Sequence, residues 1–159
     1  MPKSDVRVDA YGEVDELNAA LGLARALGVD PDLGTLIETL QRDLHAVAAR
    51  LADPEHHIAP RVTKVEIGQA AIARLESEID RLETEVPPLK RFVLAGGCEA
   101  GAALHLARTI CRRAERRMVA LGVAADDPDL LVYANRLSDL LFVLARVVNH
   151  RAGLPETEW

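Results

Sequence analysis

Aromatic side chains are scarce in this chain: Phe, Trp and Tyr make up 3% of the residues, although 49% are hydrophobic. The core must therefore be built from Leu, Val, Ile and Ala. This composition favours packed helices over a β-sandwich, whose strands depend on aromatic and β-branched residues. At 159 residues the chain can bury a sizeable core as one unit. We therefore expect a single all-α domain over residues 1–159.

Cysteines and long apolar runs are scarce too. Cys98 and Cys111 are the only cysteines in the sequence, which excludes a disulfide framework and fits a reducing cytoplasm. No apolar stretch approaches the roughly 18 uncharged residues of a membrane-spanning helix, and none near the start has the pattern of a signal peptide. The formal net charge of −6 argues against general nucleic-acid binding. We expect a cytoplasmic protein that binds neither a membrane nor nucleic acid.

Helical spacing fills most of the sequence. Apolar residues recur every three or four positions, and Gly or Pro closes most segments. Thr63 and Glu66 form the pattern of a capping box at the start of the third segment. Because short connections join long amphipathic segments, the sequence predicts a five-helix antiparallel bundle. The predicted helices cover residues 9–27, 33–52, 63 to about 82, the stretch from just after Gly97 to 121, and 127–150.

The fourth predicted helix concentrates positive charge. It contains the stretch HLARTICRRAERR, residues 105–117, with arginine at five positions. At about 100° per residue, Arg108, Arg112 and Glu115 fall within about 60° of one another, whereas Arg113 and Arg117 lie on a separate edge. One interpretation is a solvated helix face with ion pairs to residues one turn away. The other is that the first stripe binds an anion, because the arginine fork matches a phosphate group.

Polar stripes also interrupt two otherwise apolar helices. Polar groups flanked by so much Leu and Val need partners, so we expect one polar cleft shared by three helices. The residues of these stripes are Asp15, Asn18 and Gly22 in the first helix, and Asn135, Asp139 and Arg146 in the last.

The segment FVLAGGCEAG precedes the arginine-rich helix. Gly96 and Gly97 permit left-handed backbone angles just ahead of a helix N-terminus, where free N–H groups favour an anion or a close ligand. Phe92 is either an ordinary core residue or an apolar plug beside a ligand. By contrast, His56 and His57 have no third ligand at a suitable spacing, so no protein metal site is predicted.

Four segments occur in the order RVDAYGEVDELNAALG, FVLAGG, LHLARTICRRAER and YANRLSDLLFVLAR. They resemble the successive motifs of the PduO-type ATP:cob(I)alamin adenosyltransferases. The match runs from Lys3 to Trp159, and the final ETEW is similar to the way many members end. The resemblance implies a five-helix bundle that assembles as a homotrimer, with active sites between adjacent subunits.

The same resemblance implies a reaction. The adenosyl group of ATP, bound with Mg²⁺, would be transferred to the cobalt of cob(I)alamin, giving adenosylcobalamin and triphosphate. ATP and cobalamin would thus both be substrates, and an adenosylcobalamin-dependent enzyme would receive the product.

The resemblance also assigns residues to ATP. Arg108 and Arg112 would face its phosphates, with Glu115 orienting that group. Lys3 matches a family position close to the phosphates, and Asn135 would contact the nucleotide or tie the cleft together. Fixed arginines and Mg²⁺ aimed at the leaving triphosphate stabilise the transition state more than the ground state.

Other residues are assigned to the corrinoid and to the subunit boundary. Phe92 would be the apolar residue that displaces the lower axial ligand, which favours four-coordinate cobalt and makes its reduction feasible. Asp15 would pair with Arg108 across the boundary between two subunits. Arg108, Asp15 and Phe92 are therefore the expected catalytic residues.

The sequence departs from the family pattern in three places. Members typically open with a Thr- and Gly-rich segment of the kind TRTGDxGxT, whose backbone wraps the phosphates, whereas the printed sequence opens MPKSDVRVDAYG. Ala95 replaces the proline of the usual LPGG, and Ala134 replaces a leucine. Two alternatives stay open: a corrinoid-binding delivery protein with impaired catalysis, and a helical interaction module whose arginine stripe meets an acidic partner.

Overall fold

Six α-helices build the parts of the chain that the computed structural model describes, residues 5–54 and 66–159. Five of them correspond to the predicted helices, and the sixth is a single turn of four residues. The predicted all-α bundle is confirmed. The helices are α1 (Val6–Gly28), α2 (Pro31–Ala52), α3 (Gln69–Glu83), α4 (Glu99–Leu121), α5 (Val123–Asp126) and α6 (Pro128–Arg151).

The third helix begins later than the capping-box pattern predicted. Its first residue is Gln69, and the N-cap residue Gly68 has an extended backbone with φ −139° and ψ −156°. Glu66 therefore lies before the helix rather than in its first turn, so the predicted start at residue 63 is wrong. Other singled-out residues lie outside the described ranges: Lys3, His56, His57 and Thr63.

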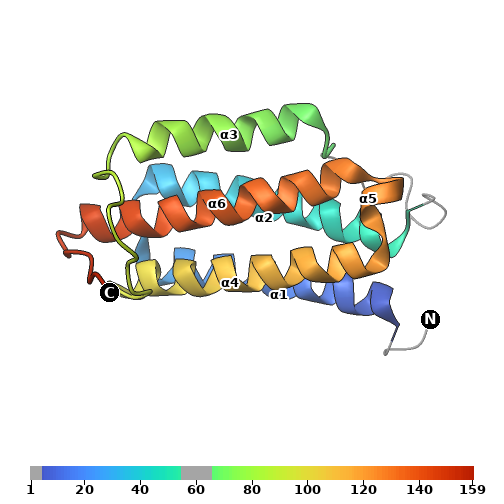
Figure 1. Ribbon diagram of the computed structural model, residues 1–159, viewed down its shortest axis with the longest axis horizontal. Helices are drawn as coiled ribbons and strands as arrows, with labels where there is room; N and C mark the ends of the chain where they lie inside the picture. The colour runs from blue at the N-terminus through green and yellow to red at the C-terminus, as the bar shows by residue number, and fades with distance from the viewer. Residues whose placement is uncertain (1–4, 55–65) are drawn as a thin grey trace.

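The long helices lie side by side, each running roughly along the long axis of the bundle (Figure 1). α1 packs against α2 and α4, and α6 packs against α4 and α3. The pairs α1–α2, α1–α4 and α4–α6 are antiparallel, as short connections predict. In contrast, α3 and α6 run in the same direction, because the intervening α4 runs the opposite way (Figure 1).

The core is aliphatic, and α6 is its most deeply buried long helix. On α4 the predicted core residues Ala107, Ile110, Ala114 and Met118 are each at most 6% exposed. Cys111 lies among them, and its burial raises the pKa of the thiol to about 12. None of the helices in the described ranges combines the length and the hydropathy that crossing a bilayer requires.

A buried polar cluster joins three helices within this core. Asp43 on α2 is 1% exposed. It accepts a hydrogen bond of 2.7 Å from the Tyr133 hydroxyl on α6 and forms an ion pair with Arg74 on α3. Since a buried carboxylate is costly without partners, this cluster fixes how α3 sits against the rest of the bundle.

Two irregular segments meet at the end of the bundle where α6 finishes (Figure 1). One is the loop of residues 87–98 before α4, here called the Phe92 loop, and the other is the C-terminal tail, residues 152–159. The Leu94 amide donates to the Thr157 carbonyl at 2.8 Å, and the Trp159 amide donates to the Phe92 carbonyl at 2.9 Å. The tail thus holds the backbone that carries Phe92.

Candidate functional site

A broad groove of about 660 Å³ opens between the Phe92 loop, α4 and α6. One wall is the loop itself, and the other is formed by helix residues that the sequence places one turn apart. The groove brings the apolar loop of FVLAGG beside the first arginine of the predicted anion-binding stripe. Its lining residues are Leu89, Lys90, Arg91, Phe92, Val93, Ala95, His105, Arg108, Asp139 and Phe142.

Phe92 stands out from the chain rather than filling the core. Its side chain is 81% exposed. Because so little of its apolar surface is removed from water, Phe92 contributes little to the stability of the fold. The interpretation of Phe92 as an ordinary core residue is therefore wrong. The ring remains available to an apolar ligand in the groove.

The opposite wall of the groove combines an aromatic ring with two nitrogen-bearing side chains. The guanidinium carbon of Arg108 lies 5.6 Å from the centre of the Phe142 ring, within the range of a cation–π contact. His105 meets the same ring edge to face, with 5.9 Å between ring centres. Burial, and next the charge of Arg108, lower the pKa of His105, which favours the neutral form of its ring.

Arg112, Glu115 and Asn135 form one connected cluster across α4 and α6. Arg112 donates to Glu115 at 2.8 Å, and Asn135 donates to the other Glu115 oxygen at 3.2 Å. The Arg112 side chain nevertheless keeps 47% of its surface exposed. Glu115 therefore orients the guanidinium without covering it, which leaves donors for an anion.

The second arginine edge has a different environment. Arg113 donates to Glu13 at 2.6 Å and to Glu16 at 2.5 Å on α1, and Arg117 lies 4.0 Å from Glu13. These ion pairs raise the pKa of Arg113 further. The second arginine edge of α4 is therefore occupied by ion pairs with carboxylates of α1.

The polar stripe of α1 does not join the groove within one chain. Asn18 donates to the Gln41 carbonyl on α2 at 3.1 Å, and the Gln41 side chain lies against Gly22. Asp15 is exposed and forms no ion pair with any residue in the described ranges. The expectation of one cleft shared by three helices is thus wrong for the single chain, because α2 satisfies this face of α1.

Arg146 also departs from its predicted place on a polar face. It is 5% exposed, donates twice to Glu156 at 2.8 and 2.7 Å, and donates to the Pro87 carbonyl at 2.8 Å. The Arg146 hydrogen bond lowers the pKa of Glu156. Sequence spacing missed this role because the partner lies beyond the end of α6.

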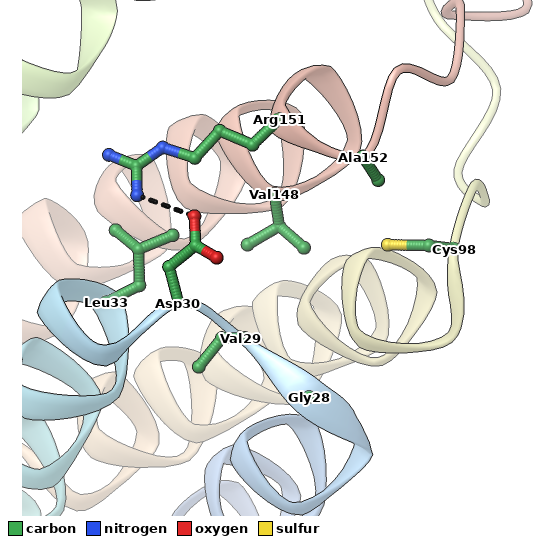
Figure 2. Close-up of a pocket in the computed structure, with 8 residues that line it drawn as sticks. All are labelled: Gly28, Val29, Asp30, Leu33, Cys98, Val148, Arg151 and Ala152. Carbon is green, nitrogen blue, oxygen red and sulfur yellow. Dashed lines mark hydrogen bonds and ion pairs between the residues drawn. The ribbon is translucent and has the colours of Figure 1, made fainter.

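A second, smaller cavity of about 310 Å³ lies at the same end of the bundle. Figure 2 shows Arg151 reaching across it to Asp30, at 3.1 Å, with Cys98 on another wall. Arg151 is also paired with Asp32 and Glu85, each at 2.8 Å. Because three carboxylates already satisfy its guanidinium, Arg151 is not free to bind an anionic ligand in this cavity.

Comparison with known proteins places this geometry in a family. The sequence model described as cobalamin adenosyltransferase matches residues 1–148. The corrinoid adenosyltransferase PduO of Salmonella typhimurium is 44% identical over 156 residues, which are 96% of this chain and 46% of that protein. The corrinoid adenosyltransferase of Bacillus subtilis is 41% identical over 162 residues, covering 99% of this chain and 81% of that one. This chain thus spans about half the length of the PduO proteins it matches.

Solved structures agree with the sequence comparison. A variant of a PduO-type ATP:corrinoid adenosyltransferase from Lactobacillus reuteri, complexed with cobalamin and ATP, superposes with a TM-score of 0.88 at 37% identity, covering 100% of this chain and 88% of that one. A second variant, complexed with ATP, gives 0.86 at 37% identity and covers 100% and 90%. The resemblance inferred from four motifs is therefore confirmed, and the chain belongs to the cobalamin adenosyltransferase family.

Proposed function

We propose that this chain transfers the adenosyl group of ATP to the cobalt of cob(I)alamin. The electron pair of cob(I) attacks the ribose C5′ of ATP, the cobalt–carbon bond forms, and the C5′–oxygen bond breaks. The bonding electrons leave with triphosphate. Adenosylcobalamin, the other product, then passes to an enzyme that depends on it. Family membership and the complexes of the Lactobacillus reuteri structures with cobalamin and ATP support this reaction.

The observation that carries the proposal is the position of Phe92. An 81% exposed phenylalanine faces an open groove whose far wall holds Arg108. A corrin ring offers such a side chain an apolar face to cover. With Phe92 against the cobalt, water and the lower axial ligand are excluded, which favours the four-coordinate state before reduction. Phe92 is therefore proposed as the residue that tunes the cobalt.

The adjacent cluster is suited to the triphosphate. Arg112 is oriented by Glu115 and remains half exposed, and Glu115 is tied to Asn135. As negative charge accumulates on the leaving group, a fixed guanidinium stabilises it without reorganising. Mg²⁺ would supply further positive charge on the phosphates. Such ions are commonly held by substrate phosphates and one or two carboxylates, and no group of three or more His, Cys, Asp or Glu residues among the described residues is placed to hold a metal ion.

The site is completed, we propose, by a second copy of the chain in a homotrimer. Arg108 and Asp15 are the two members of the predicted cross-subunit pair. Within the described ranges neither has an ion-pair partner of its own chain. The ATP site would then include Asp15 of one subunit and Arg108 of its neighbour, while Lys3 remains assigned to the phosphates by motif position alone.

Binding measurements with both ligands test this function against a delivery protein. Cob(II)alamin is titrated into the chain with and without MgATP, and its absorption spectrum is followed. If the chain is an enzyme, MgATP should change the absorption spectrum of the bound cob(II)alamin, because four-coordinate cobalt forms only when the site is complete. Equal affinity and identical spectra in both titrations, without any product after reduction, would favour the delivery protein. A folded chain that binds no corrinoid would favour the interaction module.

A further inference from the structure

Two residues of α6 hold the two ends of the Phe92 loop by hydrogen bonds to its backbone, an arrangement called the grip below. At its start, Arg146 donates to the Pro87 carbonyl at 2.8 Å. At its end, the Asn149 side chain donates to the Gly96 carbonyl at 2.8 Å and accepts from the Cys98 amide at 2.9 Å. Arg146 and Asn149 are three positions apart and so lie on one side of the helix. Between these anchors the loop projects Phe92 into the groove.

Asn149 is a buried polar residue with both amide groups committed to this loop. It is 6% exposed, and each end of its amide pairs with a backbone group on either side of Gly97. Buried polar groups require such partners, and here the partners specify the path of the backbone rather than fill space. The bond pair closes the turn just before α4 begins, so it sets both the loop and the first turn of the arginine helix.

Two glycines make room for Asn149. A Cβ on Gly97 would lie 2.2 Å from the Asn149 Oδ1 atom, and a Cβ on Gly101 would lie 2.0 Å from it. Gly97 also has φ +107°, a region that favours glycine. Gly101 lies inside α4, where glycine weakens a helix and alanine would strengthen it. Its presence is explained by the close approach of Asn149.

We propose that Asn149 is the positioning residue for Phe92: it locks the Gly96–Cys98 turn and thereby fixes where the exposed phenyl ring stands against the corrinoid. This inference rests on the proposed adenosyl transfer for its functional half. Its structural half, the grip on the loop, stands without any substrate. Asn149 itself does not touch the reacting atoms, so its effect on the reaction passes through Phe92.

Hydrogen exchange tests the grip in the absence of ligands. Asn149→Leu keeps a similar side-chain volume and removes both amide bonds. Exchange at the Cys98 and Leu94 amides should rise roughly tenfold, because the turn then opens locally without global unfolding. The matched control is Gln41→Leu, which removes another side-chain amide bonded to backbone, between α2 and α1, and should leave those two amides unchanged. Equal protection of the loop in Asn149→Leu and the unsubstituted chain would overturn the proposal.

Turnover tests the functional half. Asn149→Leu should lower kcat by roughly 10- to 100-fold, the cost of a misplaced reactive group, while the KM for ATP changes little. It should also reduce the fraction of bound cob(II)alamin that becomes four-coordinate. Because Asn149 acts through Phe92, adding Asn149→Leu to Phe92→Ala should cost little more than Phe92→Ala alone. Losses that multiply would overturn the proposed coupling, whereas an inactive unsubstituted chain would instead overturn the proposed reaction.

A glycine variant distinguishes the loss of the Asn149 hydrogen bonds from a general loss of folding. Gly101→Ala should raise the intrinsic stability of α4 yet displace Asn149, so it should reproduce the loop exchange and the lower kcat of Asn149→Leu. Introducing Asn149→Ala together with Gly101→Ala removes the clash, so the pair should behave like Asn149→Ala alone. If Gly101→Ala leaves both loop exchange and kcat unchanged, the assignment of Asn149 is wrong.

Discussion

Arg112 and Glu115 form a 2.8 Å ion pair one turn apart on α4, and Glu115 is held in turn by Asn135 of α6. This relay turns an ordinary helix-surface pair into an oriented one. Arg113, the immediate neighbour of Arg112, instead forms ion pairs with Glu13 and Glu16 of α1. Arg112 thus remains available to an anionic ligand and Arg113 does not, because different helices face the two side chains.

Arg112 should act on the nucleotide and not on the corrinoid. Arg112→Ala should lower kcat/KM for ATP by roughly 10- to 100-fold, since charge-assisted bonds to phosphate are lost. Corrinoid affinity should stay nearly unchanged, because the proposed contact is with the nucleotide. Initial rates over a range of ATP concentrations, with a separate cobalamin titration, measure the two effects. Arg117→Ala is the control on the same helix and should alter neither. Parallel losses of ATP and corrinoid binding in Arg112→Ala would contradict the assignment.

Phe92 should matter to the reaction and hardly at all to stability. Because the side chain is 81% exposed, Phe92→Ala should change the free energy of unfolding by less than about 0.5 kcal/mol. It should nevertheless abolish most of the four-coordinate cob(II)alamin signal and reduce kcat at least about tenfold. Leu94→Ala serves as a matched control, since Leu94 is also exposed in this loop and does not line the groove. An undiminished four-coordinate signal in Phe92→Ala would exclude the proposed role.

Asp15 should link assembly to activity. Asp15→Asn keeps the shape of the side chain and removes the charge, so it should weaken the trimer and lower turnover if the partner is Arg108 of a neighbouring subunit. Sedimentation velocity over a range of protein concentrations measures assembly, and initial rates measure turnover. Asp9→Asn, an exposed aspartate earlier on α1, should preserve both. A trimer of unchanged stability with full activity in Asp15→Asn would rule out the pairing.

The pair of Arg146 and Glu156 predicts a pH dependence of stability. Arg146 lowers the folded-state pKa of Glu156, so the pair stabilises the fold above the ordinary glutamate pKa of about 4.3. That contribution is lost as the pH falls through the lower folded-state pKa. At pH 7, Glu156→Gln should cost roughly 1.5–3 kcal/mol, because the nearly buried guanidinium keeps only neutral partners.

Urea unfolding at several pH values between 7 and 3 provides the measurement. The difference in unfolding free energy between the unsubstituted chain and Glu156→Gln should shrink toward zero at the acid end, where Glu156 itself is protonated. Asp32 and Glu85 supply their own acid dependence in both proteins, because hydrogen bonds from Arg151 lower the pKa of each. A difference that stays constant across the range would mean that the ion pair contributes nothing.

The helices and their buried faces were predictable from spacing, because the 3.6-residue period decides which side of α4 meets the core. The separation of Arg112 from Arg113 was predictable for the same reason. What stands opposite each face was not. Nothing in the sequence around Asn18 indicates that Gln41 of α2 satisfies it, so this part of the α1 stripe does not join the cleft of α4 and α6 within one chain.

Residues that act beyond a helix end were the hardest to predict. Arg146 was placed on a polar face, but its carboxylate partner lies ten positions on, in the C-terminal tail. Asn149 was not singled out at all, since it follows an apolar run in which one amide carries little signal. Gly97 and Gly101 offered a hint of close approach four residues apart. They did not indicate which side chain approaches.

The most direct test of the account is turnover by the chain itself. We would incubate it anaerobically with chemically reduced cob(I)alamin, ATP and Mg²⁺, and measure adenosylcobalamin and triphosphate together. We predict the two products in a one-to-one ratio, at a rate well above a protein-free control and strongly reduced by Arg112→Ala. A folded chain that binds cobalamin but forms neither product would contradict it.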